Sequence, residues 1–238
     1  MELVCRKIFL LFLLVSFSQK LMAQRKPVVE FEKVDFTKND SLQLLKEFGQ
    51  HKKFIPQFTL QSLIALSYYP ELKHTHIRFI YKPAHSPLTT RPTFPSVLFK
   101  KSNRRFTITI SDSTVDKLEP ILLKQMSFNE QVGVIGHELG HVSDFTRRSI
   151  FSMVGSGLGH IFSSHYIDRF EYRTDSICIA HGLGYQLLAW STFVRRTMNR
   201  KNWEGADNVN ASVMTRERYM NPSTISRRIA ANPRYSNQ

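Results

Sequence analysis

The chain has 238 residues, of which 42% are hydrophobic and 22% are charged. That balance suits one globular domain with a buried core and excludes a mostly disordered chain. The formal net charge of +14 favours anionic partners such as an anionic envelope surface, or else serves only to keep the protein soluble. No nucleic-acid module accompanies the charge, so nucleic acid is not an expected partner.

The N-terminus, residues 1–23, has the layout of a secretory signal peptide. Arg6 and Lys7 precede an apolar run over 8–17, and the small residue Ala23 precedes the expected cut. The run is about ten residues long, whereas a membrane span takes about 20. We therefore expect an exported mature chain, 24–238, that is periplasmic or secreted, forms a single domain and has no transmembrane segment. A retained N-terminal anchor is the alternative.

Cysteine usage agrees with a domain that does not depend on disulfides. Cys5 lies within the expected signal peptide, which leaves Cys178 alone in the mature chain. A lone cysteine cannot form an internal bridge. Because Cys178 lies in an apolar helical segment, we expect it to be a small buried hydrophobic residue.

Helices open the mature chain. The pattern predicts one over 41–48, capped by Asp40 or Ser41, and a second over 60–68, capped by Thr59.

Strands follow these helices. Period-two alternation predicts strands over 76–81 and 105–111, and the four prolines of the stretch 82–95 predict a loop between them.

The second half is predominantly helical. A short helix is predicted over 118–126, and Ser127 with Glu130 has the spacing of a capping box that opens a helix running to about residue 145. An exposed loop is predicted over 201–210. Three further helices are predicted at 166–181, 185–198 and 223–231. Mixed elements followed by helices indicate an α+β fold.

The stretch 131–141 reads Q-V-G-V-I-G-H-E-L-G-H and contains H-E-x-x-H on the predicted helix. Residues four apart lie on one helix face, so His137 and His141 can bind one metal ion. Glu138 points elsewhere, but its carboxylate can reach a metal-bound water and act as the general base. The apolar residues around the motif favour this reading over an exposed polar face.

A third protein ligand is expected, because catalytic zinc is usually held by three residues and a water molecule. The metzincin extension is excluded, since Asp144 and Arg147 stand where it requires Gly and His. Glu171 is the better candidate, and Asp175, one turn later, can accept a hydrogen bond from a ligand histidine ring.

Other residues of this region compete for these roles. Asp144 and Asp168 are the nearest alternative acids, and three histidines are expected to stay off the metal: His160, His165 and His181. The donor that stabilises the oxyanion stays open among five residues: His165, Tyr166, Tyr172, Arg173 and Tyr219.

On the motif V-I-G-H-E-L-G-H at 134–141 and E-x-x-x-D at 171–175, the chain resembles gluzincin zinc metallopeptidases, and among them the HtpX-like family. Asn221 opens the segment N-P-S-T-I-S-R-R-I, where that family usually has His. The resemblance implies a zincin-like fold, zinc bound by two histidines and one glutamate, and an edge strand beside the active-site helix that pairs with an extended peptide. The segment 106–111 is the expected edge strand.

The sequence therefore predicts an exported zinc-dependent endopeptidase that hydrolyses peptide bonds. A zinc-stabilised binding or chaperone-like envelope protein without catalysis is the alternative, but such a site needs no base and is usually closed by four ligands. A third reading is a basic envelope-binding protein that binds no metal.

Overall fold

The computed structural model describes residues 25–149, 164–213 and 215–236. The expected signal peptide and His160 lie outside these ranges. Within them, no helix has both the length and the apolar composition that crossing a membrane requires.

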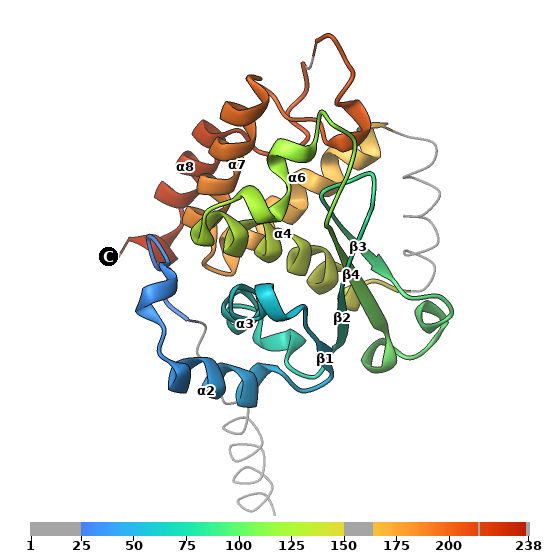
Figure 1. Cartoon of the computed structure of the whole chain (residues 1–238), viewed down its shortest axis with the longest axis vertical. Coiled ribbons are helices and arrows are strands. Elements are labelled where there is room, and N and C mark those ends of the chain that lie inside the picture. The colour runs from blue at the N-terminus through green and yellow to red at the C-terminus, as the bar shows by residue number, and fades with distance from the viewer. Residues whose placement is uncertain (1–24, 150–163, 214, 237–238) are drawn as a thin grey trace, which may run out of the picture.

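The described part of the chain is a mixed α+β fold, as predicted (Figure 1). The strands form a four-stranded sheet in the order β1-β2-β4-β3, with bounds Lys52–Lys53 for β1, His76–Lys82 for β2, Leu88–Pro92 for β3 and Arg105–Ser111 for β4. The α-helices are α2 (Lys38–Phe48), α3 (Thr59–Ser67), α4 (Phe128–Arg147), α6 (Ser164–Ala180), α7 (Gly184–Met198) and α8 (Pro222–Ala230).

The sheet differs from the prediction at its edge. β4 pairs with β2 in parallel and with β3 in antiparallel orientation, so the segment 106–111 is central and cannot be the edge strand. The edge beside α4 is β3, which was predicted to be loop. Pro92 is the last residue of β3, and Pro87 directly precedes the strand. Neither proline therefore removes a backbone hydrogen bond to β4 from the interior of the strand.

Two helix predictions also need correction. The segment 118–126 is not an α-helix but two 3-10 turns, Glu119–Ile121 and Leu123–Gln125, separated by extended Leu122. α2 begins earlier than expected, because Thr37 and Asp40 form a capping box.

The bounds of the other helices agree closely with the predictions, although the predicted cap of α3 does not. Thr59 is the first residue of α3 and follows a 3-10 turn, so it is not the cap. The later helices were predicted to within two residues at each end.

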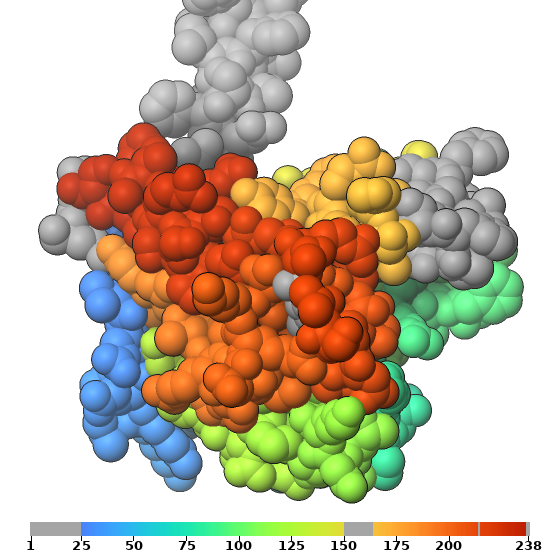
Figure 2. Space-filling model, turned by 90° about the horizontal axis from the view of Figure 1, so that it is seen from above, coloured from blue at the N-terminus to red at the C-terminus, as the bar shows by residue number. Residues whose placement is uncertain are grey.

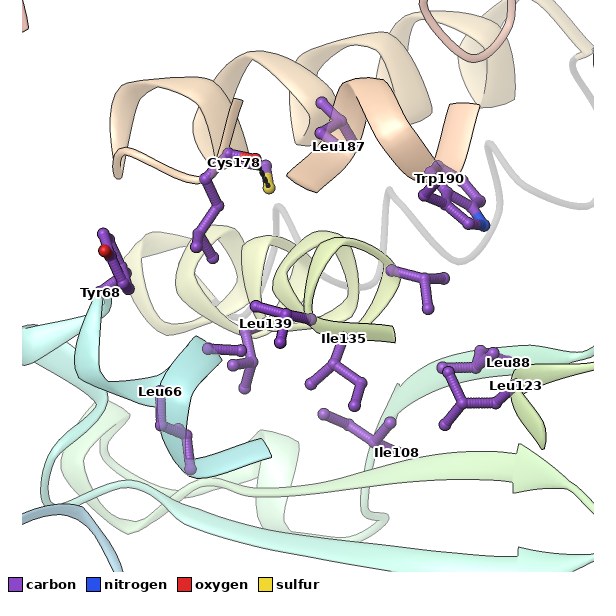
Figure 3. Close-up of a cluster of buried hydrophobic side chains, with 14 of the residues drawn as sticks. Leu66, Tyr68, Leu88, Ile108, Leu123, Ile135, Leu139, Cys178, Leu187 and Trp190 are labelled. Carbon is purple, nitrogen blue, oxygen red and sulfur yellow. Dashed lines mark hydrogen bonds between the residues drawn. The ribbon is translucent and has the colours of Figure 1, made fainter. Parts of the chain in front are cut away.

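Helix α4 is the centre of the fold (Figure 3). Ile135 and Leu139 lie on the side of the sheet near Ile108, while Cys178 and Leu187 cover the opposite side of the helix from α6 and α7. Cys178 is fully buried, as predicted. The apolar side chains on both sides explain why α4 is buried along most of its length.

Glycine lets α7 approach α4 closely. A Cβ atom on Gly133 would lie 2.2 Å from the carbonyl oxygen of Gln186, far inside van der Waals contact. The helices can therefore meet only if position 133 has no side chain.

Both ends of α4 are satisfied by side chains. At the start, Ser127 and Glu130 form the predicted capping box. At the end, the buried guanidinium of Arg104 donates to the carbonyl oxygens of Phe145 and Arg148. A cation beside the last carbonyls also suits the helix dipole. The capped helix fixes the position of the H-E-x-x-H motif.

The chain after α6 forms one face of the molecule. Figure 2 shows this face, where α7, α8 and the segment between them lie against the light-green segment that precedes α4. The contact between α7 and the 3-10 turn Glu119–Ile121 agrees with this view.

A partly buried polar cluster lies on the far side of α4. Glu71 Oε1 accepts hydrogen bonds from His181 Nε2 at 2.9 Å and from Ser143 Oγ at 2.5 Å. Burial alone would raise the pKa of Glu71, but these hydrogen bonds outweigh it and lower that pKa to about 2. The ionised carboxylate therefore ties the turn at residues 70–72 to both α4 and the end of α6.

We expect Glu71→Gln to lower the free energy of unfolding at pH 7 by about 1 kcal/mol, because the carboxylate is partly exposed and solvent screens its charge. Because the folded-state pKa lies below the ordinary 4.5, the contribution is complete above pH 4.5 and is lost as the pH falls toward 2. Urea denaturation in the presence of a chelator measures it. The exposed Glu30→Gln is the control, and a Glu71→Gln deficit that stays constant between pH 7 and pH 2 would contradict the assignment.

Candidate metal centre

Two imidazoles of α4 lie one helical turn apart on the same face. The rings of His137 and His141 have centroids 4.8 Å apart and are nearly perpendicular, at 89°. Both side chains are buried. The buried helix thus presents two nitrogen ligands at one place, as the spacing predicts.

Glu171 reaches both histidines from α6. Its Oε2 lies 3.1 Å from Nε2 of His137 and 3.2 Å from Nε2 of His141. The three potential ligand atoms all lie within 4.8 Å of one another. Ligand atoms bound about 2 Å from a common tetrahedral ion are separated by roughly 3 to 3.5 Å, so the set suits a transition metal.

The hydrogen bonds behind the rings set their tautomers. Nδ1 of His137 lies 2.8 Å from the Asp175 carboxylate, which can only accept when ionised. Nδ1 of His141 lies 3.1 Å from the Thr174 hydroxyl, whose own proton is donated to the Phe170 carbonyl oxygen. Both Nδ1 atoms therefore carry a proton, so a metal would bind both rings through Nε2 and would displace from His137 the second proton that this ring retains in the metal-free protein.

The charged groups of the site shift one another's pKa values. Burial alone would lower the pKa of His137, but Asp175 and Glu171 outweigh it and raise that pKa to about 10. Burial alone would raise the pKa of Glu171, but His141 and His137 lower it well below its ordinary value. The carboxylate is therefore ionised, which is the form that binds a cation.

Glu138 lines the same pocket as His137 but does not belong to the cluster of three ligand atoms. Its side chain is 6% exposed, and its Oε2 is buried without a hydrogen-bond partner among the described residues. Its main-chain oxygen accepts a hydrogen bond from Thr90 of β3 at 3.2 Å. A buried carboxylate oxygen without a donor needs a partner from solvent or substrate.

The competing acids and histidines lie elsewhere. His181 binds Glu71 on the far side of α4, and His165 is exposed at the start of α6. Asp144 and Asp168 pair with arginines. None of these four belongs to the cluster that can hold a metal among the described residues.

The partners of the candidate oxyanion donors distinguish Tyr219 from the others. The Tyr166 hydroxyl accepts from Arg148, Arg173 pairs with Asp144, and the Tyr172 ring lies under Arg228. This leaves Tyr219, whose ring centroid lies 5.5 Å from that of His137. Burial and the charges of Glu171 and Glu138 raise the pKa of Tyr219 well above its ordinary value, so its hydroxyl stays a donor at neutral pH.

The main chain on both sides of the Tyr219 side chain is held in place. Its carbonyl oxygen accepts from Arg195 at 2.9 Å, and the next amide, of Met220, donates to Asp175 at 2.7 Å. Asn221, at the position where the resemblance expects His, turns its side chain to Arg195 and Asn202. Among the described residues, the side chain of Asn221 therefore forms its hydrogen bonds away from both histidines of the cluster.

Sequence reasoning missed two residues of the site. Thr174 lies three residues after Glu171, so helical spacing alone placed it on the face that meets α4. Trp190 gave no comparable signal, yet its ring centroid lies 5.4 Å from that of His137. Its position depends on how α7 packs against α4.

Peptidase family M48 matches residues 104–227, which spans β4, the zinc-motif helix, α6 and the segment bearing Tyr219. The chain belongs to peptidase family M48. No curated protein and no solved structure matches the chain. The family supports a metallopeptidase that acts on polypeptides and is typically zinc-dependent, and it brings the cluster of His137, His141 and Glu171 within its matched range.

The site predicts tight zinc binding that depends on its ligands. We expect His137→Ala and Glu171→Gln each to weaken zinc affinity by more than about 100-fold, because even the loss of a residue behind a ligand costs 10- to 100-fold. Competition with a chromophoric chelator measures this, and circular dichroism checks that each variant is folded.

The matched control is His165→Ala, the same change at an exposed histidine of α6. Full zinc binding by folded Glu171→Gln and His137→Ala proteins would contradict the assignment.

Proposed function

We propose that this member of peptidase family M48 is a zinc-dependent endopeptidase with His137, His141 and Glu171 as metal ligands and Glu138 as general base. The observation that carries the proposal is the convergence of three ligand atoms beside a buried carboxylate oxygen that has no partner among the described residues. Bound zinc supplies a Lewis acid that polarises the scissile carbonyl and eases deprotonation of water.

The residues of the chain supply the proton transfers. Glu138 accepts the proton of the attacking water and passes it to the leaving nitrogen, for which its Oε2, an oxygen without a hydrogen-bond partner among the described residues, is suited. Asp175 and Thr174 hold the protons on Nδ1 of the two histidines throughout. The rings therefore keep one tautomer and one orientation.

Tyr219 is the proposed donor to the developing oxyanion. Its hydroxyl belongs to a side chain that lines the same pocket as His137 and Glu138, and its backbone is fixed by Arg195 and Asp175. A donor held in place before the reaction stabilises charge without reorganisation.

The substrate backbone is proposed to add to β3. Pro87 and Thr93 direct their hydrogen bonds to β4, so by alternation the peptide groups of Leu88 and Thr90 face outward. Thr90 also bonds the main chain of Glu138. An extended peptide paired with this edge would therefore run beside the general base.

Two finer proposals rest on the sequence. Export to the periplasm or beyond follows from the signal-like residues 1–23. Placement in the HtpX-like group follows from the motifs at 134–141 and 171–175. A non-catalytic zinc module is the alternative, and the unpartnered oxygen of Glu138 beside the ligands is better explained by catalysis.

Glu138→Gln should retain zinc and lose at least about 100-fold in kcat for casein or peptide cleavage, because the amide cannot accept the proton. Metal analysis and a protease assay on the same preparation measure both quantities. Glu30→Gln, an exposed change of the same kind, should match the wild type. Undiminished cleavage by Glu138→Gln protein would refute its role as base.

Tyr219→Phe should lower kcat by about 100- to 1000-fold with little change in KM, since the hydroxyl acts on the transition state. The control is Tyr172→Phe, which removes a hydroxyl from another of the candidates and should leave kcat within about threefold. Equal activities of the two variants would remove Tyr219 from the mechanism.

A further inference from the structure

One face of the sheet packs against the core and the other faces solvent. Along the two central strands, β2 and β4, every second side chain is buried in the core: Ile77, Phe79, Phe106, Ile108 and Ile110. Because successive side chains of a strand point to opposite faces, the residues between these positions share the solvent face. On β3 the same face carries Thr89 and Arg91, which are in register with Thr109 and Thr107 of β4.

The solvent face of the sheet is rich in cations. Lys53 of β1 is in register with Arg78 of β2, and Arg91 of β3 lies in the same row on the other side of β4. With two more exposed cations of this face they form what we call the basic sheet face: Lys53, Arg78, Lys82, Arg91 and Arg105. Within the described ranges, none of these five side chains forms an ion pair with a carboxylate.

Acids are almost absent from this part of the chain. The stretch 48–111 includes all four strands and contains one acid, Glu71. Glu71 belongs to the polar cluster on the far side of α4, so it does not neutralise the sheet. Burial, and after it the nearby His51 and Arg105, lower the pKa of His76, which lies on the solvent face of β2. The basic sheet face therefore presents a positive potential to its surroundings.

Exposed apolar side chains lie beside the basic sheet face. The connection between β3 and β4 carries three of them, which we call the apolar tip: Phe94, Leu98 and Phe99, with 78%, 53% and 47% of their surfaces exposed. Figure 1 shows this connection at the periphery of the molecule, beyond the ends of both strands. Two further cations, Lys100 and Lys101, directly follow the apolar tip. Large apolar side chains that are exposed together mark an interaction surface.

We propose that the basic sheet face and the apolar tip together dock on an anionic lipid bilayer. Lys and Arg side chains are attracted to anionic headgroups, while neighbouring Phe and Leu side chains bury apolar surface at the boundary between headgroups and acyl chains. A soluble polyanion would pair with the cations, but it has no acyl layer to take up the apolar tip. The combination of both features therefore favours a lipid surface.

The docking surface is separate from the metal centre. Thr90 points from β3 toward α4 and bonds the main chain of Glu138, whereas its neighbours Thr89 and Arg91 belong to the opposite face of the strand. Docking through the basic sheet face therefore requires no residue of the metal-binding cluster. Lipid binding can be measured without turnover, so this proposal and the proposed peptidase function stand or fall separately.

Flotation with lipid vesicles tests the proposal on the full chain. The vesicles contain phosphatidylcholine alone or with about one-third phosphatidylglycerol, and residues 1–23 are present in every protein compared, so their contribution is common to all. We expect at least about tenfold tighter binding to the anionic vesicles at low salt and loss of that preference in about 0.5 M NaCl, because salt screens the headgroup charge. Equal binding to the two kinds of vesicle would overturn the proposal.

Matched charge variants locate the effect. The triple variant Lys53→Gln, Arg78→Gln, Arg105→Gln removes three cations of the basic sheet face and should weaken binding to anionic vesicles at least about tenfold. A control with the same net charge changes one lysine and two arginines at exposed positions of three helices and should bind within about threefold of the wild type: Lys38→Gln, Arg169→Gln and Arg196→Gln. If both triple variants bind equally, net charge alone governs binding and the docking surface is refuted.

The apolar tip distinguishes a bilayer from a soluble polyanion. The double variant Leu98→Ser, Phe99→Ser should bind anionic vesicles at least about fivefold more weakly and keep its retention on heparin. The control Leu42→Ser, Leu45→Ser changes two exposed leucines of α2 and should bind vesicles like the wild type. Undiminished vesicle binding by the tip variant, or retention of the wild type on heparin or duplex DNA without binding to anionic vesicles, would contradict docking on a bilayer.

Discussion

The structure depends on one contact between two helices, in which acceptors on α6 hold the imidazole protons of α4. Asp175 and Thr174 each take one Nδ1–H, and Glu171, on the same face of α6, meets both Nε2 atoms. The contact fixes tautomer, ring orientation and the third ligand together. Because the helices are buried and their approach is set by small residues, little freedom remains in this arrangement.

Asp175 links this contact to the rest of the site. One of its oxygens holds His137 and the other holds the amide of Met220, directly after Tyr219. A single carboxylate thus joins a metal ligand to the candidate oxyanion donor. A change at position 175 should therefore affect both the metal-binding residues and Tyr219, which lines the pocket beside His137.

The sequence allowed the site to be predicted better than the sheet. Helical spacing placed His137 and His141 on one helix face and Glu171 and Asp175 on another, and the need for a third ligand suggested that the two faces meet. Thr174 lies on the same face as Glu171 but was not predicted to belong to the site. The edge strand was predicted wrongly, because strand order depends on pairing between distant segments, and β3 was hidden by the prolines at its ends. The pocket could not be predicted, because its wall combines residues of β3, α4, α7 and the turns near them, and no local sequence pattern shows that these elements meet.

The central claim is that two imidazoles and one carboxylate bind zinc. X-ray absorption at the zinc edge of the purified protein measures the ligands directly. The account predicts two imidazole nitrogens at about 2.0 to 2.1 Å, with oxygen atoms completing a first sphere of about four ligands. A zinc–sulfur distance of about 2.3 Å, a sphere without imidazole, or no zinc in the protein would contradict it.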